Sequence, residues 1–452
     1  MSNKEPAASI AIDPLLPPWQ GWLPFFIAAA GIGGAAVLFW AASHYVHGLL
    51  FDVVRGYPFL PLVVTPLGFA IIAAITNKYF PSAQGSGVPQ TIAAINSNDP
   101  NHAIKLLSIP IAIAKITLTS AGQMCGASIG REGPMVQVGA SILYTVSRFM
   151  PTDRMPRHQF DRSLIAAGGA AGVASAFNTP IAGIVFAIEQ LIKLIDARTC
   201  VVIVAAVAIA TAVARTVFAD YGYFSHIAVS LPSYSAWGAM LVCSIAGGVF
   251  GGLFSYGLIP FTKILPSFVH KFKQDSPVRF AALCGLCVAV LGLLSNGTVY
   301  GNGSHETQQL LHGTQTLPIT YFLLKWLATF FSCVSNIPAG LFAPSLAVGA
   351  GLGANVSMMD SSAPAAAFIL LGVAAYFSGV FQAPITAVVI VTEMSGSYSM
   401  TLPLMAVSLI ATAISRLICR RTFYSTMSEK WLERLVLKQS LGSGPRVKHS
   451  KN

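Results

Sequence analysis

Charged residues are scarce in this chain of 452 residues. Asp, Glu, Lys and Arg together make up 10% of it, whereas hydrophobic residues make up 54%. A soluble domain carries about 25% charged residues. The composition therefore excludes an ordinary soluble protein and predicts an integral membrane protein, in which a charge inside an apolar segment indicates function by default.

Acidic residues are fewer than basic ones, 16 against 27, which gives a net charge of +11. Cytoplasmic segments of membrane proteins are enriched in Lys and Arg, so a basic C-terminal end is expected to be a cytoplasmic tail. A basic and aromatic surface outside the membrane part is missing from the sequence, and nucleic-acid binding is not expected. The basic residues near this end are Arg416, Arg420, Arg421, Lys430, Arg434, Lys438, Arg446, Lys448 and Lys451.

The seven cysteines are scattered and lie mostly in apolar runs, so they do not indicate a disulfide framework. Cys284 and Cys287 form a C-x-x-C, but without a second pair or a nearby His it indicates packing rather than a metal or redox site. An intramembrane hydrolase would need a nucleophile with a base in reach, and the sequence shows no His or Lys at a suggestive spacing from Ser86. An enzyme, a cofactor and a metal site are therefore not expected.

Long polar segments are also few. The first 19 residues are polar and Pro-rich and lack the layout of a cleaved signal peptide, so the apolar run from about Trp22 to Ala42 is expected to be a retained membrane helix. Apolar runs continue to about Cys419 and allow about 16 to 18 helical segments. The polar breaks expected to be loops lie near 97–104, 150–162, 219–233, 270–278 and 296–317.

Glycine and proline are abundant, at 40 and 27 residues, and many lie within the apolar runs. Several helices are therefore expected to be broken or tilted, which a membrane tolerates only where protein or a cavity covers the exposed backbone. The composition changes only after about residue 425. The expected organisation is a polar tail over 1–19, a transmembrane domain over 20–425 and a basic tail over 426–452.

Two segments of the chain recur in the same order. Residues 130–140 match residues 340–350 at an offset of 210, and residues 177–189 match residues 381–393 at an offset of 204. The chain therefore reads as a duplicated half, roughly 20–215 and 234–420. Transporters with internal repeats often bind substrate where discontinuous helices of the two halves meet, so the helix starts at Pro134 and Pro344 are expected to converge.

A charged pair lies within Gly130-Arg131-Glu132-Gly133-Pro134. Proline suits the first turn of a helix and glycine permits close approach of the backbone. The amides after the proline lack intrahelical partners, and in a membrane their natural partner is an anion. Glu132 is an anion attached to the same place, so it can occupy the site when ionised and leave it when protonated. An ordinary capped helix start is the alternative, which the membrane composition disfavours.

Gly85-Ser86-Gly87-Val88-Pro89 predicts a third helix start of the same kind, with a hydroxyl among free amides. Taken alone, it fits a flexible loop before a helix equally well. A phosphate-binding loop is excluded because Gly-Lys-Ser/Thr does not follow. Three helix N-termini and a hydroxyl would hold an anion weakly enough to release it, as conduction requires.

Residues 85–90, 130–134, 340–344 and 423–425 together resemble the four anion-pathway motifs of the CLC chloride channel and transporter family in content, order and spacing. The resemblance covers about residues 30–430. It implies an all-α polytopic membrane protein with an inverted-repeat bundle, and a homodimer with a separate pore in each subunit. It also implies transport of chloride and protons, and the inner membrane of a bacterium as the location.

The resemblance also implies roles for single residues. Ser86 Oγ, the hydroxyl of Tyr424 and helix-start amides would bind a central anion, with Glu132 as the external gate. By itself Tyr424 would fit an interfacial aromatic belt better. Lys115 is similar to a buried lysine of the family, with snorkelling to the interface as its alternative. The candidate anion-binding residues are Ser86, Tyr424, Leu341, Phe342, Gly130, Arg131 and Gly133, and the helix-start residues are Gly85, Gly87, Pro89, Pro134, Gly340 and Pro344.

Two positions depart from the family pattern. Gln90 replaces a usual Glu at a peripheral place. Gln190 replaces the internal glutamate with which exchangers commonly handle protons, and an amide cannot carry a proton. Glu189 next to it is expected to be structural, like its repeat mate Glu393. The expected function is chloride/proton antiport with Glu132 as the gate, and the alternative is a passive voltage- or pH-gated chloride channel.

Overall fold

The computed structural model describes residues 19–152, 156–192, 196–218, 237–259, 267–360 and 363–442, with Phe224, Ile227 and residues 229–231 between them. The described chain is helical, and its only β-type pairings are two isolated bridges. The expected all-α fold is confirmed. The polar tail over 1–19 lies outside the described residues except for its last position, as does the end of the basic tail over 443–452.

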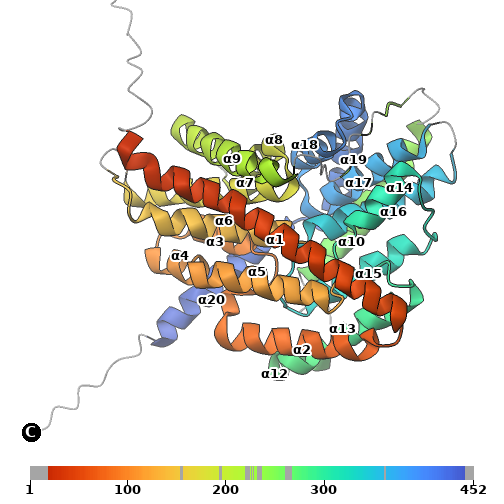
Figure 1. The fold of residues 1–452 in the computed structure, drawn as a ribbon, viewed down its shortest axis with the longest axis horizontal. Helices are drawn as coiled ribbons and strands as arrows, with labels where there is room; N and C mark the ends of the chain where they lie inside the picture. The colour runs from red at the N-terminus through yellow and green to blue at the C-terminus, as the bar shows by residue number, and fades with distance from the viewer. Residues whose placement is uncertain are drawn as a thin grey trace, which may run out of the picture.

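The helices of the first half are α1 (Leu23–Gly56), α2 (Pro61–Tyr79), α3 (Val88–Asn96), α4 (Pro100–Leu106), α5 (Ile109–Met124), α6 (Glu132–Ser147), α7 (Arg157–Phe177), α8 (Pro180–Phe186) with a π-helical continuation (Ala187–Leu191), and α9 (Ala197–Phe218). Those of the second half are α10 (Trp237–Leu258), α12 (Ser267–Asp275), α13 (Pro277–Leu294), α14 (Ser304–His312), α15 (Tyr321–Val334), α16 (Phe342–Ser357), α17 (Ala365–Phe381), α18 (Pro384–Ser395), α19 (Thr401–Ile418) and α20 (Phe423–Gly442). Figure 1 shows α6, α7 and α9 on one side and α14, α16 and α17 on the other, with α1 running across both.

Seven helical stretches of the described chain are long and apolar enough to cross a membrane. The first of them, α1, has 34 residues and continues to Gly56, so the expected end near Ala42 is wrong. At 1.5 Å per residue α1 is about 50 Å long, which exceeds a hydrocarbon core of about 30 Å. A helix of this length must tilt or extend beyond the core.

Other helices are much shorter. The helices α3, α4, α8 and α14 have nine, seven, seven and nine residues, too few to cross a bilayer. The expected broken helices are therefore present. The prediction of loops near 97–104, 270–278 and 296–317 was wrong in part. The helices α4, α12 and α14 lie wholly or largely within these three segments. These helices are short and polar, so the apolar runs used to find helices did not reveal them.

The two halves are built on equivalent helix pairs, α6 with α7 and α16 with α17. A Cβ on Gly139 of α6 would collide with the backbone carbonyl of Gly168 on α7, and a Cβ on Gly349 would collide with that of Gly372. Small residues at such crossings allow helix backbones to touch in membranes. The same contact in both halves is what the sequence repeat predicts.

The halves also cap each other's helices. The amides of Ile181 and Ala182 donate to the Glu393 carboxylate at 3.1 and 2.8 Å, and those at the start of α18 donate to Glu189 in the same way at 3.2 and 2.7 Å. A carboxylate at a helix N-terminus satisfies free amides and opposes the helix dipole. The expected structural role of Glu189 and Glu393 is confirmed.

The basic tail begins as a structured element. Helix α20 starts at Phe423 and packs against α3, so it crosses the expected boundary between residues 425 and 426. Docking on α3 buries Tyr424 beside the start of that helix. The boundary based on composition therefore does not coincide with the end of the packed structure.

Candidate functional site

Three helix starts meet at the centre of the molecule. Gly130 and Gly340 exchange backbone hydrogen bonds of 2.8 and 3.1 Å, which joins the segments before α6 and α16. Gly85, before α3, donates to the carbonyl of Ile337 at 3.1 Å and accepts from Ala339 at 3.0 Å. The convergence expected from the repeat is therefore present. These two bridges hold the N-termini of α3, α6 and α16 around a common point.

Glycine is required where these segments touch. A Cβ on Gly133 would lie 2.7 Å from Ser86 Oγ and 3.3 Å from Cα of Gly340, and a Cβ on Gly340 would lie 2.8 Å from Cδ of Pro134. A larger residue would push the helix starts apart. Gly87 has a φ of 96°, in the left-handed region that glycine enters without strain, and this turn leads into α3 with Pro89 in its first turn.

Lys115 holds the first of these segments in place. Its side chain is fully buried, and Nζ donates to the carbonyls of Ala83 at 2.8 Å and Gly85 at 2.6 Å. The alternative that Lys115 snorkels to the interface is therefore wrong. The ammonium satisfies carbonyls that the irregular backbone before α3 leaves without helical partners.

Glu132 lies at the meeting point and is fully buried. Its Oε1 is 3.9 Å from Nε of Arg131, so the two side chains form a weak ion pair, and the Arg131 side chain is 10% exposed. A Cβ on Gly130 would collide with Oε2 of Glu132 and touch Ala343 and Pro344 of α16. The carboxylate of the first-half motif thus lies against the helix start of the second half.

Two hydroxyls lie at the same centre without a partner. Ser86 Oγ and the Tyr424 hydroxyl are buried and lie close to each other, and neither meets the geometry of a full hydrogen bond with a described residue. The Tyr424 ring is fixed by Phe381, at a centroid distance of 5.2 Å, and by Phe342 at 6.0 Å. Buried polar groups without partners are rare and need an explanation. Two fixed O–H donors beside helix N-termini are suited to holding an anion.

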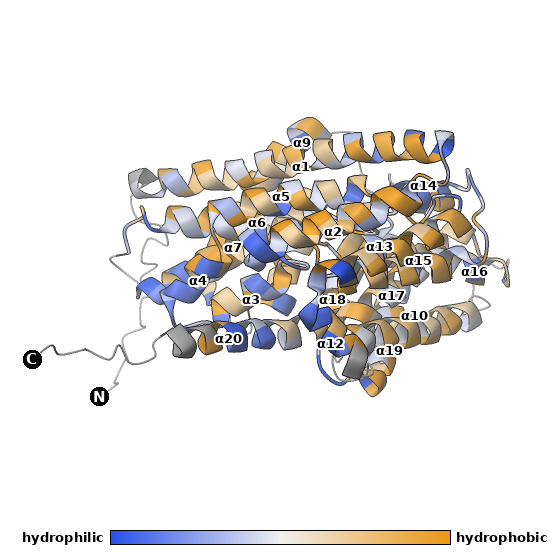
Figure 2. Cartoon of the chain, turned by 90° about the horizontal axis from the view of Figure 1, so that it is seen from below, coloured by the Kyte–Doolittle hydropathy of each residue, from blue (hydrophilic) through white to orange (hydrophobic). Residues whose placement is uncertain are grey.

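The centre lies between two cavities. The first has a volume of about 100 Å³ and includes Arg131 in its lining, and the second has a volume of about 140 Å³ and includes Ser86 and Leu341. The first is bounded by α1, the end of α7 and the start of α14, and the second by α12, α15 and α20. In Figure 2, α14 lies near the upper edge and α12 and α20 near the lower edge. Glu132, Ser86 and Tyr424 therefore lie where a path between the cavities would pass.

Comparisons with known proteins identify the family of the chain. A family model described as "Voltage gated chloride channel" matches residues 68–416. The chain belongs to the CLC family. It is 30% identical over 378 residues to the protein named H(+)/Cl(-) exchange transporter ClcA of Vibrio cholerae, covering 81% of this chain and 78% of that protein. It is 29% identical over 426 residues to the ClcA of Cronobacter sakazakii, covering 89% and 87%.

Solved CLC structures share the fold. The structure of a slow cyanobacterial Cl⁻/H⁺ antiporter matches with a TM-score of 0.75 at 21% identity, covering 93% of this chain and 99% of that one. A CLC-type fluoride/proton antiporter matches with a TM-score of 0.73 at 23% identity, covering 90% and 97%. The inverted-repeat CLC bundle is thereby shown. Members of this family are transporters, so the chain is an integral membrane transport protein and not an enzyme.

Gln190 of this CLC chain lines neither of the two cavities. It belongs to the π-helical turn Ala187–Leu191 that follows α8, and it is half-buried. Its neighbour Glu189 is held by the start of α18. The structure thus places no carboxylate from this turn in either cavity.

The sequence analysis missed Lys273 and assigned Lys430 and Arg434 only to the basic C-terminal end. Lys273, Lys430 and Arg434 line the second cavity, and its lining includes no carboxylate. Burial, with help from the nearby Lys430 and Arg434 cations, lowers the pKa of Lys273 to about 8. Helix α12, which carries Lys273, is not among the candidate spans. The approach to Ser86 from this side is therefore positively charged, but Lys273 lies far from Lys430 and Arg434 in the sequence, so the sequence does not reveal the cluster.

Lys325 was also missed, although the sequence held a signal for it. It lies 210 positions after Lys115, the offset of the first repeated segment, and it too is fully buried. Its Nζ donates to the carbonyls of Val299 at 2.9 Å and Gly301 at 3.0 Å. The second half therefore contains the same lysine clamp as the first.

Proposed function

We propose that this CLC protein exchanges chloride for protons, with Glu132 as the protonatable gate. The observation that carries the proposal is a fully buried carboxylate at converging helix starts, beside two partnerless hydroxyls and between two cavities. Chloride would accept hydrogen bonds from Ser86 Oγ and the Tyr424 hydroxyl and from the amides at the starts of α6 and α16. The names of the ClcA relatives support chloride and protons as the exchanged ions.

The gate follows from the charge of Glu132. As an anion it competes with chloride for the same helix N-termini, which attract either one. When it takes up a proton, it loses that attraction and a chloride ion can replace it. Release of the proton on one side and of chloride on the other returns the carboxylate to the site. Because one side chain carries both events, each proton moved is linked to movement of the anion.

Exchange is proposed despite Gln190. An internal carboxylate would only deliver protons to Glu132, and water entering from the second cavity can do this instead, since that cavity reaches Ser86. The competing candidate is a passive chloride channel, and Gln190 is the observation that favours it. The two functions differ in whether protons move when chloride does.

Simultaneous recording of chloride and pH tests the proposal. The protein is reconstituted into liposomes, a chloride gradient is imposed, and both ions are followed together. An exchanger drives protons against their gradient while chloride moves. Chloride flux without any pH change would establish the channel, and absence of chloride flux would reject both functions.

Glu132 is tested in the same assay. In Glu132→Ala the tethered competitor is gone, so chloride flux should persist, lose its pH dependence and carry no protons. Glu132→Gln should behave like the protonated state. Proton coupling that survives in Glu132→Ala would show that another group carries the proton.

The proposed setting is the inner membrane of a bacterium, with α20 and the second cavity on the cytoplasmic side. The basic residues of α20 support this orientation, because Lys and Arg are enriched on that side. A homodimer is proposed from the family resemblance. Every residue proposed to bind the anion belongs to one chain, so each subunit would have its own pathway.

A further inference from the structure

The two halves contain matching segments that differ in one charge. Residues 301–307 lie 216 positions after residues 85–91, and in both segments two glycines precede a helix of nine residues, α3 or α14. The glycines of the first segment have φ of 63° and 96°, and those of the second have 64° and 77°. This register makes Glu306, in the first turn of α14, the equivalent of Gln90, in the first turn of α3.

A buried lysine lies behind each segment. Lys115 donates to the carbonyl of Gly85 at 2.6 Å, and Lys325 donates to that of Gly301 at 3.0 Å. Both lysine side chains are fully buried. A buried charge is costly unless it is paired and hydrogen-bonded, so the charges around each lysine matter.

The second lysine has a carboxylate beside it. Glu306 is 2% exposed, and its charge acts on Lys325, so the two charges offset each other. Among the residues that the structure describes, no carboxylate forms an ion pair with Lys115. The residue equivalent to Glu306 is the uncharged Gln90. One positive charge is therefore left unopposed in the first half, whereas its counterpart in the second half is opposed.

Gln90 lies directly beside the unopposed lysine. Its side chain is fully buried, and Nε2 donates to the carbonyls of Ser82 and Gln84. The carbonyl oxygen of Gln84 is also 3.5 Å from Nζ of Lys115, so the ends of the two side chains meet at one atom. A carboxylate in place of the Gln90 amide would therefore lie next to the ammonium and offset its charge.

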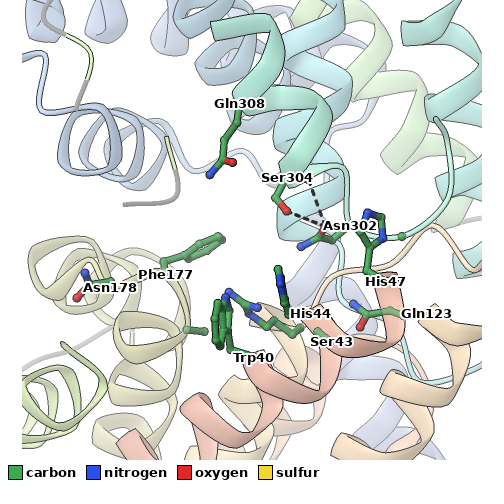
Figure 3. Close-up of a pocket in the computed structure, with 13 residues that line it drawn as sticks. Trp40, Ser43, His44, His47, Gln123, Phe177, Asn178, Asn302, Ser304 and Gln308 are labelled. Carbon is green, nitrogen blue, oxygen red and sulfur yellow. Dashed lines mark hydrogen bonds between the residues drawn. The ribbon is translucent and has the colours of Figure 1, made fainter. Parts of the chain in front are cut away.

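The two segments also differ in their central residue. Asn302 uses Oδ1 to accept from the amide of Ser304 at 3.2 Å and from its hydroxyl at 3.0 Å, and Figure 3 shows these bonds as dashed lines. Ser86, at the equivalent place, has a buried hydroxyl that does not meet the geometry of a full hydrogen bond with a described residue. The unopposed charge is thus in the half whose segment offers a hydroxyl to the centre.

The charge of Lys115 lies close behind this hydroxyl. Gly85, whose carbonyl accepts from Lys115, is the residue before Ser86, and the second cavity is lined by Gly85, Ser86 and Gln90 together. This lining contains no carboxylate. Charges interact more strongly where protein replaces water. A negative charge at the place of Gln90 would therefore weaken the hold on an anion at Ser86.

We propose that Gln90 sets how tightly the central site holds chloride, because its uncharged amide leaves the charge of Lys115 unopposed. The proposal rests on the proposed chloride transport and adds a residue that determines its affinity. Gln90 acts through Lys115 and the electric field at the centre, without contact to the ion. A carboxylate here would make the first half resemble the second, in which Glu306 opposes Lys325.

Calorimetric titration of the full chain with chloride tests the inference. Every protein in this test carries Glu132→Gln, which removes the tethered competitor and the pH dependence that Glu132 itself contributes. Gln90→Glu adds the carboxylate, and Gln90→Met, of similar length and without charge, is the matched control. At pH 7 the dissociation constant for Gln90→Glu should exceed that for Gln90→Met by about tenfold or more.

The pH profile separates charge from shape. A glutamate carboxyl has an ordinary pKa of about 4.3, so acidification neutralises the added group, and the ratio of the two dissociation constants should fall toward one between pH 7 and pH 4. Helices α4, α6 and α7 also pack against α3 and bring no residue to the lining of the second cavity. The titratable groups that face the added carboxyl are present in both variants and cancel in the ratio; they are Lys115 and, in the cavity lining, Lys273, Cys333, Lys430 and Arg434.

Glu306→Gln is the mirror control, made in the same Glu132→Gln background. It removes the carboxylate beside Lys325, but Glu306 lines neither cavity, so the dissociation constant should stay within about twofold of the background. Tighter binding in Glu306→Gln, by as much as Gln90→Glu weakens it, would reduce the result to an effect of net charge and would overturn the inference.

The other outcomes are equally distinct. A ratio near one at pH 7 would overturn the role of Gln90 and leave the proposed function intact. A ratio that stays equally high down to pH 4 would show a defect of shape and would overturn it as well. If the Glu132→Gln background binds no chloride at any pH, the proposed function fails together with this inference.

Discussion

The hydroxyl of Tyr424 offers the sharpest test of the central site. Tyr424→Phe removes one oxygen and keeps the ring, whose packing against Phe381 and Phe342 does not involve the hydroxyl. The hydroxyl lies near Ser86 but does not meet the geometry of a full hydrogen bond with a described residue, so its removal should leave the melting temperature in detergent nearly unchanged. Any loss must then come from the bound anion.

The size of that loss follows from one hydrogen bond to a charged group. Such a bond contributes about 1.5–3 kcal/mol, so Tyr424→Phe should weaken chloride binding by about 10-fold to 150-fold. Calorimetric titration of the purified protein with chloride measures this directly. Proton coupling in liposomes should loosen as well, because the site holds its anion less firmly while Glu132 moves.

Tyr321→Phe provides the control. Tyr321 is buried at the start of α15 and lines neither the first nor the second cavity, so its hydroxyl is outside the site. Chloride binding in this variant should equal that of the parent. If Tyr424→Phe also binds chloride like the parent, the hydroxyl does not face the anion, and the central site is misassigned.

Three further changes test the pathway. Ser86→Pro removes the other partnerless hydroxyl, so the preference for chloride over nitrate, measured as relative flux, should narrow or reverse; an unchanged ratio would exclude Ser86 from the selective site. Gln190→Glu should leave proton coupling intact or speed proton delivery; coupling that appears only in this variant would show that the parent is a channel. Lys273 is charged below its pKa of about 8 and neutral above it, so the initial rate at low chloride should fall as pH on the α20 side rises through 8. Lys273→Gln should be slow at all pH values, and Lys273→Arg should stay fast across the same step; a parent rate that is flat through pH 8 would refute this role.

The sequence by itself determined the class of the protein and its repeated architecture. Hydropathy along the chain predicts membrane helices because each segment needs only its own composition to partition into lipid. Proline after glycine predicts helix starts because both residues act on their own backbone. The positions of Glu132 and Ser86 in such starts, and the offset between the halves, could therefore be found before any contact was known.

Tertiary structure alone decided what surrounds these residues. Whether Lys115 snorkels or clamps carbonyls depends on a loop about 30 residues earlier in the chain. Likewise, the hydroxyl of Ser43 faces a cavity because α1, α7 and α14 enclose it. The burial of a residue, its hydrogen-bond partners and the charge around it depend on contacts between segments far apart in sequence. Composition and motifs therefore cannot predict them. The two cavities, and with them the route to Glu132, exist only once the helices have packed.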